Sequence, residues 1–266
     1  MWAALGVLSR YSVWFRARGE KWRKEDPFRN EPPTWVGSGR CRHTVGIIKE
    51  FWHLHWPLVA ACRELDVSYD ILDISGPDWF QVLKDSNCNA FIARPSVQYR
   101  PWKEMYEERL RVFVASDSRL VFPDLDALWM WESKRRMHYW MRANGIEQPD
   151  TWIFYDEESA LAFAANCELP VVFKSDSGSG ASGVIVFQNR GALRRHIKRC
   201  FWRGFTTYRK ARHDREYGSV VFQRFIKGVR EWRSVRVGAS YFAYEKVKGS
   251  EFHSGSGDFK YGRPPD

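Results

Sequence analysis

The chain has 266 residues, a formal net charge of +10, and contents of 44% hydrophobic and 28% charged residues. These values are ordinary for a soluble globular protein, and the length allows two modest α/β domains with separate cores. No apolar run reaches the roughly 18 residues of a spanning helix, so we expect no transmembrane segment. The five cysteines are odd in number and include no C-x-x-C pair, so we expect neither a zinc site nor a disulfide framework, and a cytoplasmic location fits best.

Residues 1–42 are expected to form a basic N-terminal segment and linker. Met1–Leu8 is apolar but short, and it lacks the basic start and cleavage site of a signal peptide. A basic amphipathic helix here would fit ordinary packing better than a position on a membrane surface. Three prolines between residues 21 and 42 predict a linker or irregular segment.

From Thr44 onward, short β-rich runs alternate with helical patterns, and residues 43–123 are expected to form one α/β domain. We predict strands over 44–48, 69–74, 90–93 and 120–122, with helices over 56–65, 78–84 and 102–111. This alternation predicts a parallel sheet covered on both faces, which would bind ligands at the carboxyl ends of its strands. His53 and His55 follow the first strand and are expected to be ordinary loop histidines or substrate contacts rather than metal ligands. Arg94, at the end of the third strand, could meet an anionic group, with an exposed surface arginine as the alternative.

The second domain is expected over residues 124–266. Asp124 or Asp126 can cap a helix over 127–143, which Asn144-Gly145 would close. Lys134 would then lie in the middle of that helix. A strand over 151–155, a helix over 157–166 and a strand over 170–174 follow.

A glycine-tipped hairpin comes next, between Val171–Lys174 and Val184–Phe187. Its glycines match G-x-G-x-x-G, but a strand follows instead of a helix and no acid occurs before Asp214, which excludes a dinucleotide-binding turn. The loop also does not match the Walker A pattern of P-loop nucleotide-binding proteins. A protein kinase is excluded because its lysine would follow the glycine loop, whereas Lys174 precedes it. The pattern favours a nucleotide phosphate held under the hairpin by Lys174, with an ordinary Ser/Gly-rich turn as an equal alternative.

Positive charge is concentrated between Arg194 and Arg215, where nine Lys or Arg residues accompany one acid, Asp214. This imbalance predicts an anionic partner near one surface. Nucleic acid is an alternative to a phosphate-rich or carboxylate ligand, because aromatic residues alternate with the charges. A solvated basic face remains the default interpretation.

The order of these pieces resembles the ATP-grasp superfamily. The matching segments are Glu132–Lys134, Gly145–Thr151, Pro170–Lys174 with the glycine loop, Val221–Gly228 as a hinge, Glu231–Gly238, and Phe252–Gly257. The last of these is similar to a loop of glutamate ligases that modify ribosomal proteins. The resemblance implies an α/β (α+β) fold, in which a pre-ATP-grasp parallel-sheet unit precedes a first lobe over 124–222 and a partial second lobe over 223–266.

The resemblance also implies a role for each matched position in ATP-dependent carboxylate-amine ligation through an acyl phosphate. Lys134 and Lys174 would bind the ATP phosphates, and the loop with Gly178, Ser179, Gly180 and Gly183 would cover them. The hinge would meet the adenine edge through Gln223, Arg224, Phe225 and Ile226. Glu231 would contact the ribose, while Arg233 and Lys246 would face the acyl phosphate or substrate carboxylate. The substrates would be a small-molecule or peptide carboxylate and an amine. The sequence leaves their identity and the oligomeric state open.

The chain departs from the family at its metal-binding end. Family members carry an Asp and then Glu-x-Asn that hold Mg²⁺, whereas no Glu-x-Asn follows Gly228 here. Mg²⁺ is therefore expected from the family, but we assign no metal ligands. An incomplete chain, a completing partner chain and a nucleotide-binding remnant without activity all remain open. A basic protein that binds nucleic acid or a membrane surface is a further alternative.

Overall fold

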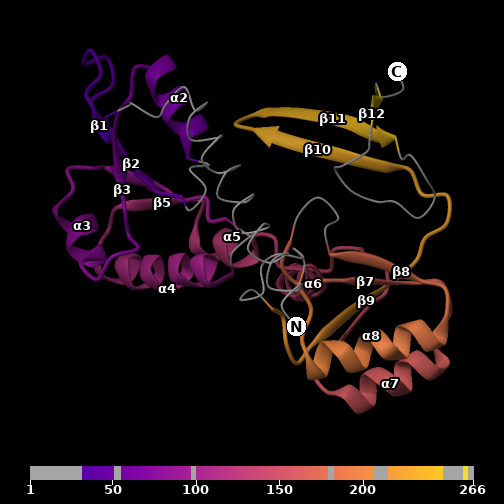
Figure 1. Ribbon diagram of the computed structural model, residues 1–266. Helices are drawn as coiled ribbons and strands as arrows, with labels where there is room; N and C mark the ends of the chain where they lie inside the picture. The colour runs from indigo at the N-terminus through magenta and orange to yellow at the C-terminus, as the bar shows by residue number, and fades with distance from the viewer. Residues whose placement is uncertain are drawn as a thin grey trace, which may run out of the picture. The chain divides into compact units, whose positions relative to one another are not determined.

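A computed structural model describes the chain at residues 32–50, 55–96, 100–178, 183–206, 215–247 and 260–262. The chain divides into two compact units (Figure 1). Unit 1 comprises Met1–Ser96 and Pro101–Leu128, and unit 2 comprises Val97–Arg100 and Trp129–Asp266. Each unit contains its own sheet and hydrophobic core.

Unit 1 is built on a five-stranded sheet with the order β1-β3-β2-β4-β5. The strands are β1 (Thr34–Trp35), β2 (Thr44–Ile48), β3 (Ser68–Leu72), β4 (Ala90–Ile92) and β5 (Leu120–Phe122). The four strands β2 to β5 are parallel, as predicted. Strand β1 pairs antiparallel with β3, so the segment expected to be only a linker contributes an edge strand.

Helices cover both faces of this sheet, which confirms the predicted layers. Helix α2 (Trp56–Glu64) packs on one face, against Ile47 and Tyr69. Helices α3 (Trp79–Asp85) and α4 (Arg100–Ser116) pack on the other face, around Phe91 and Phe113 (Figure 1). The alternating side chains of short, apolar strands thus supply two separate core layers.

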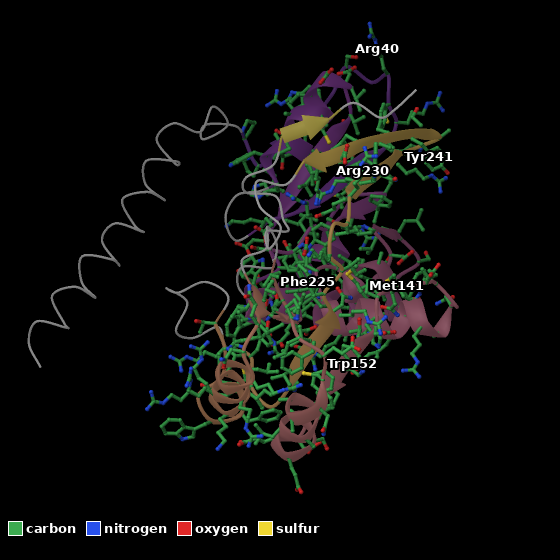
Figure 2. All side chains as sticks on the ribbon, turned by 90° about the vertical axis from the view of Figure 1, so that its right-hand side faces the viewer. Arg40, Met141, Trp152, Phe225, Arg230 and Tyr241 are labelled. Atoms are coloured by element: carbon green, nitrogen blue, oxygen red, sulfur yellow. The ribbon has the colours of Figure 1, made fainter. Side chains whose placement is uncertain are left out.

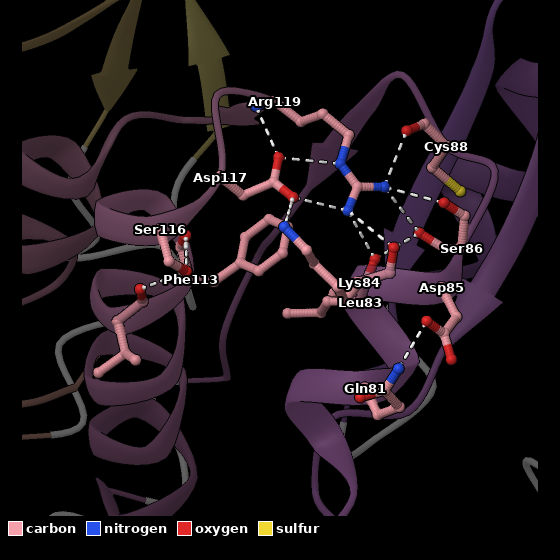
Figure 3. Close-up of polar contacts among 11 residues, drawn as sticks. Gln81, Leu83, Lys84, Asp85, Ser86, Cys88, Phe113, Ser116, Asp117 and Arg119 are labelled. Atoms are coloured by element: carbon pink, nitrogen blue, oxygen red, sulfur yellow. Dashed lines mark hydrogen bonds and ion pairs between the residues drawn. The ribbon is translucent and has the colours of Figure 1, made fainter.

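Arg119 joins the end of helix α3 to the segment that precedes β5 (Figure 3). Its guanidinium donates to the carbonyl oxygens of Leu83 and Ser86, both at 2.9 Å. The same group pairs with Asp117 through Nε at 3.0 Å and a terminal nitrogen at 2.9 Å, and these hydrogen bonds hold the pKa of Asp117 far below its usual range. Arg119 therefore satisfies carbonyl groups that the helix end leaves without an intrahelical donor.

Unit 2 contains a four-stranded antiparallel sheet with the order β6-β9-β7-β8. Its strands are β6 (Thr151–Phe154), β7 (Val171–Lys174), β8 (Val184–Phe187) and β9 (Val220–Arg224). Helices α7 (Glu157–Asn166) and α8 (Arg190–Trp202) cover one face, where Phe173 and Phe222 are buried (Figure 1). Because side chains alternate along a strand, Lys174 and Gln223 lie on the opposite face.

The single helix predicted over 127–143 is wrong. The structure has α5 (Leu125–Met130) and α6 (Lys134–Ala143), with a break between them. Glu132 adopts a positive φ of 53°, and the Ser133 side chain caps α6 by accepting a hydrogen bond from the Arg136 amide. Lys134 is therefore the first residue of a helix and not a mid-helix position. The predicted closure is confirmed, with Asn144 as the C-cap and Gly145 at φ +65°.

A second antiparallel sheet of unit 2 consists of β10 (Glu231–Val237), β11 (Ser240–Val247) and β12 (Lys260–Gly262). Arg230 precedes β10, and Tyr241 lies near the turn at the opposite end of the β10–β11 hairpin (Figure 2). In the part of the chain that the structure describes, no helix is long and apolar enough to cross a membrane.

Candidate functional site

Lys174 ends strand β7 on the sheet face that α7 and α8 leave uncovered. Its ammonium donates to Oε1 of Gln223 on the neighbouring strand β9. The amide nitrogen of Gln223 in turn donates to Oγ1 of Thr151 at 2.9 Å, which fixes the direction of its carbonyl oxygen. The half-buried Lys174 is thus held by a neutral partner.

A second ammonium group lies close to the first. Lys134 Nζ donates to the carbonyl oxygen of Gly178 at 3.1 Å and to Glu132 at 3.2 Å. Burial lowers the pKa of Lys174, and the charge of Lys134 lowers it further, while Glu231 acts in the opposite direction. An anion between the two lysines would relieve this repulsion, so the pair has the character of a phosphate or carboxylate site.

Asp176 ties the start of the glycine loop to the N-terminus of α6. Its carboxylate accepts from Ser133 Oγ at 2.8 Å, from the Arg135 amide at 2.9 Å and from the Arg135 guanidinium at 2.8 Å. Its main-chain oxygen accepts from the Lys134 amide at 2.9 Å. These contacts fix the position of Lys134 relative to the loop. The sequence motifs did not predict this role for Asp176.

Glu216 holds the same loop from another side. Its carboxylate accepts from the main-chain amides of Asp176 and Ser177, both at 2.7 Å. Burial raises the pKa of Glu216 to about 7, although the two amide hydrogen bonds act to lower it. Glu216 reaches the loop because residue 216 forms an isolated β-bridge with Phe205, at the end of α8.

The loop geometry requires glycine at two of the predicted positions. Gly178 has φ +140°, which side chains rarely adopt. A Cβ on Gly183 would lie 1.7 Å from Ser175 Oγ, and the Ser175 amide donates to the Gly183 carbonyl at 2.8 Å. The predicted hairpin is confirmed by the register that places Lys174 opposite Val184. Ser179 and Gly180 lie outside the described residues.

The predicted polar positions of the second sheet share one face of the β10–β11 hairpin. Glu231 pairs with Lys246 across the strands, and Arg233 pairs with Tyr244. Lys246 is only 7% exposed, and its ammonium lies 2.6 Å from Glu231 Oε1. The structure therefore joins two positions to which the resemblance gave separate roles, and it leaves Arg233 exposed beside them.

The hinge segment Val221–Gly228 begins within β9 and continues past the end of that strand at Arg224. The Arg224 amide donates to the Asp150 carbonyl at 2.8 Å, and the two side chains form an exposed ion pair at 2.8 Å. Phe225 is half-buried and Ile226 is 45% exposed. The amide of Arg224 is thus engaged within the protein.

Among the described residues, no three His, Cys, Asp or Glu side chains gather where they could hold a metal ion. His55 is buried at the start of α2, where its Nδ1 accepts from the Glu50 amide at 3.1 Å, and Arg94 is exposed. His53 and the loop Phe252–Gly257 lie outside the described residues.

Comparison of sequences finds no matching protein-family model and no matching curated protein. Comparison of structures finds N5-carboxyaminoimidazole synthase from Aspergillus clavatus, solved with ADP and 5-aminoimidazole ribonucleotide, at 12% identity and a TM-score of 0.51, covering 77% of this chain and 54% of that one. The Staphylococcus aureus N5-carboxyaminoimidazole synthetase with ADP has 9% identity and a TM-score of 0.54, covering 82% and 58%. The ADP complex of a further N5-carboxyaminoimidazole ribonucleotide synthetase has 11% identity and a TM-score of 0.54, covering 82% and 57%.

The chain thus spans little more than half the length of these similar structures. The chain has the fold of the ATP-grasp superfamily.

Proposed function

We propose that the chain binds ATP and uses it to join a carboxylate to an amine. The observation that carries this proposal is the pair of ammonium groups of Lys174 and Lys134 beside Gly178, where the half-buried Lys174 donates to the neutral side chain of Gln223. Such an arrangement suits the multiply charged phosphates of a nucleotide better than a neutral ligand. ADP is bound in three similar structures of the same fold, which supports a nucleotide as the ligand.

The residues around the lysines have separate roles in this proposal. Lys174 and Lys134 bind the phosphates, and the glycine loop over 178–183 covers them with main-chain amides. Asp176 and Glu216 are positioning residues, because they hold the loop and the start of α6 without occupying the face between the lysines. The main chain at 225 and 226 meets the adenine edge, together with Gln223 and Arg224 at the end of β9.

The β10–β11 hairpin supplies the remaining groups. Glu231 binds the ribose, and Arg233 and Lys246 neutralise the carboxylate substrate. In this reaction class ATP converts the carboxylate into an acyl phosphate, which gives the amine a leaving group to displace. Mg²⁺ would support that chemistry by neutralising phosphate charge, and we assign it no ligand in this chain. A cytoplasmic location is in keeping with five free cysteines.

Lys174→Ala tests the phosphate site. We expect this substitution to raise the dissociation constant for ATP at least about 10-fold, since a charge-assisted contact contributes about 1.5–3 kcal/mol. The free energy of unfolding should change little, because burial disfavours this ammonium in the folded state. Displacement of a fluorescent ATP analogue measures the affinity, with Lys84→Ala, at an exposed position in the last turn of α3, as the control. Equal ATP affinity in the two variants would refute the site.

Phosphate release then tests the ligase activity. The wild-type chain is incubated with ATP, Mg²⁺, an amine and a series of different carboxylates. Phosphate release that requires a carboxylate and is lost in Lys174→Ala would support ligation. Binding of ATP without any such release would instead support a nucleotide-binding protein that does not ligate.

A further inference from the structure

Helix α8 presents an exposed face that is entirely basic. Over Arg190–Trp202 the helix contains no Asp or Glu, and Leu193, Ile197 and Cys200 are buried against the sheet. The exposed basic residues of the helix and its C-cap are Arg190, Arg194, Arg195, Lys198, Arg199 and Arg203. Within the part of the chain that the structure describes, none of these six side chains forms an ion pair with a carboxylate.

This face is electrostatically unfavourable for the isolated protein. Like charges four residues apart repel one another along the helix, as in Arg190 with Arg194 and Arg195 with Arg199. Arg190 also stands in the first turn, where the helix dipole favours acids, although Arg199 in the last turn is favourably placed. Neighbouring helix α7 has the opposite and favourable arrangement, with Glu157 and Glu158 in its first turn. A bound anion would compensate the repulsion on α8.

The basic face is separate from the proposed nucleotide site. Leu193 and Ile197 of α8 pack against Phe173 and Phe222 on one face of the antiparallel sheet. Lys174 projects from the opposite face of that sheet, as the alternation along β7 requires. The charges on α8 therefore have no part in holding the nucleotide.

An exposed aromatic ring stands at the end of this face. Trp202 is 71% exposed, and the guanidinium of Arg203 stacks on its ring at 4.0 Å. An indole with this exposure and a guanidinium on one face forms a surface on which a nucleic-acid base can stack.

We infer that the α8 face binds single-stranded nucleic acid, with its Arg and Lys residues on the phosphates and Trp202 stacked on a base. The charges extend along a helix about 20 Å long, and this convex, linear distribution suits an extended polyanion better than a compact ligand. An exposed tryptophan adds base stacking, which an acidic peptide would not require. A membrane surface is disfavoured because Trp202 is the only large apolar side chain of α8 that is prominently exposed in the described structure.

Fluorescence anisotropy with a labelled, mixed-sequence single-stranded RNA of about 20 nucleotides tests this inference. The triple variant Arg194→Gln, Arg195→Gln, Lys198→Gln should raise the dissociation constant about 10-fold or more. Between about 50 and 200 mM salt it should also reduce the slope of log K against log salt by about 2, since each lost phosphate contact removes about 0.7. A control triple variant removes the same charge from exposed positions of unit 1: Arg40→Gln, Arg42→Gln, Arg111→Gln. This control should change the dissociation constant for RNA less than about 2-fold.

Trp202→Ala separates nucleic acid from other polyanions. This variant should weaken RNA binding about 5-fold or more, because base stacking on an aromatic ring is lost, and it should leave heparin binding unchanged. Urea unfolding midpoints equal to wild type confirm that both variants are folded. Absence of RNA binding, equal losses in the two triple variants, or equal binding of RNA by wild type and Trp202→Ala would overturn the inference. Stronger binding to acidic peptide or to anionic vesicles than to RNA would overturn it in favour of that partner.

Discussion

Replacing Asp176 with asparagine keeps the size of the side chain and removes its charge. The amide oxygen can still accept from Ser133 and from the Arg135 main chain, but the amide nitrogen then faces the Arg135 guanidinium. Breaking a fully buried ion pair costs about 3–5 kcal/mol, and an exposed pair contributes less than about 1 kcal/mol. The side chains of Asp176 and Arg135 are 13% and 20% exposed, so we expect an intermediate loss of about 2 kcal/mol.

Urea unfolding measures this loss. With a denaturant dependence of about 2 kcal/mol per molar, the midpoint should fall by about 1 M. Asp150→Asn is the matched control, because it removes an ion pair with Arg224 whose side chains are 52% and 58% exposed, and it should cost less than about 0.5 kcal/mol. Burial acts to raise the pKa of Asp176, but the Arg135 contacts lower it overall, so the difference from wild type should disappear as pH falls below about 4. Equal losses for the two variants at pH 7 would refute the bracing role of Asp176.

Two further predictions concern Glu216 and Arg119. The pKa of Glu216 is raised to about 7 in the folded chain, so this group should lower the free energy of unfolding by up to about 3 kcal/mol as pH rises from about 4.5 to above 7. Urea unfolding over that range should show a flatter pH dependence for Glu216→Gln, and parallel curves would contradict the assignment. Arg119→Met removes the Asp117 pair and the donors to the end of α3, which should cost about 3 kcal/mol and lower the thermal midpoint by about 10 °C. Arg111→Met, at an exposed position of α4, is the control, and an equally stable Arg119→Met would contradict the capping role.

The sequence was sufficient for elements whose signals are local. Alternation of apolar residues predicted the parallel strands of unit 1, and the run from Val171 through the glycines to Phe187 predicted the β7–β8 hairpin. Asn144-Gly145 predicted where α6 ends. In each case the residues that decide the structure lie within a few positions of one another.

Features that depend on distant partners were missed. The break before α6 is fixed by Ser133, whose hydroxyl contacts Asp176 at a separation of 43 residues. Ser133 at the start of a helical run is a capping signal, yet the pattern around it continues as one helix. Strand β1 is two residues long and exists only because it pairs with β3. Glu216 accepts a hydrogen bond from the main-chain amide of Asp176, 40 residues away in the sequence. No local sequence pattern marks such a residue as part of the loop.

Calorimetric titration of the 266-residue chain with ATP, with and without Mg²⁺, decides whether Lys174 and Lys134 hold a nucleotide. We expect binding at one site per chain that is tighter with Mg²⁺ than without and at least about 10-fold weaker in Lys174→Ala. Binding that is equal with and without Mg²⁺ would keep the nucleotide site and contradict the ligase assignment. Absence of ATP binding under both conditions would contradict the account, because the paired ammonium groups of Lys174 and Lys134 would then have no nucleotide to hold.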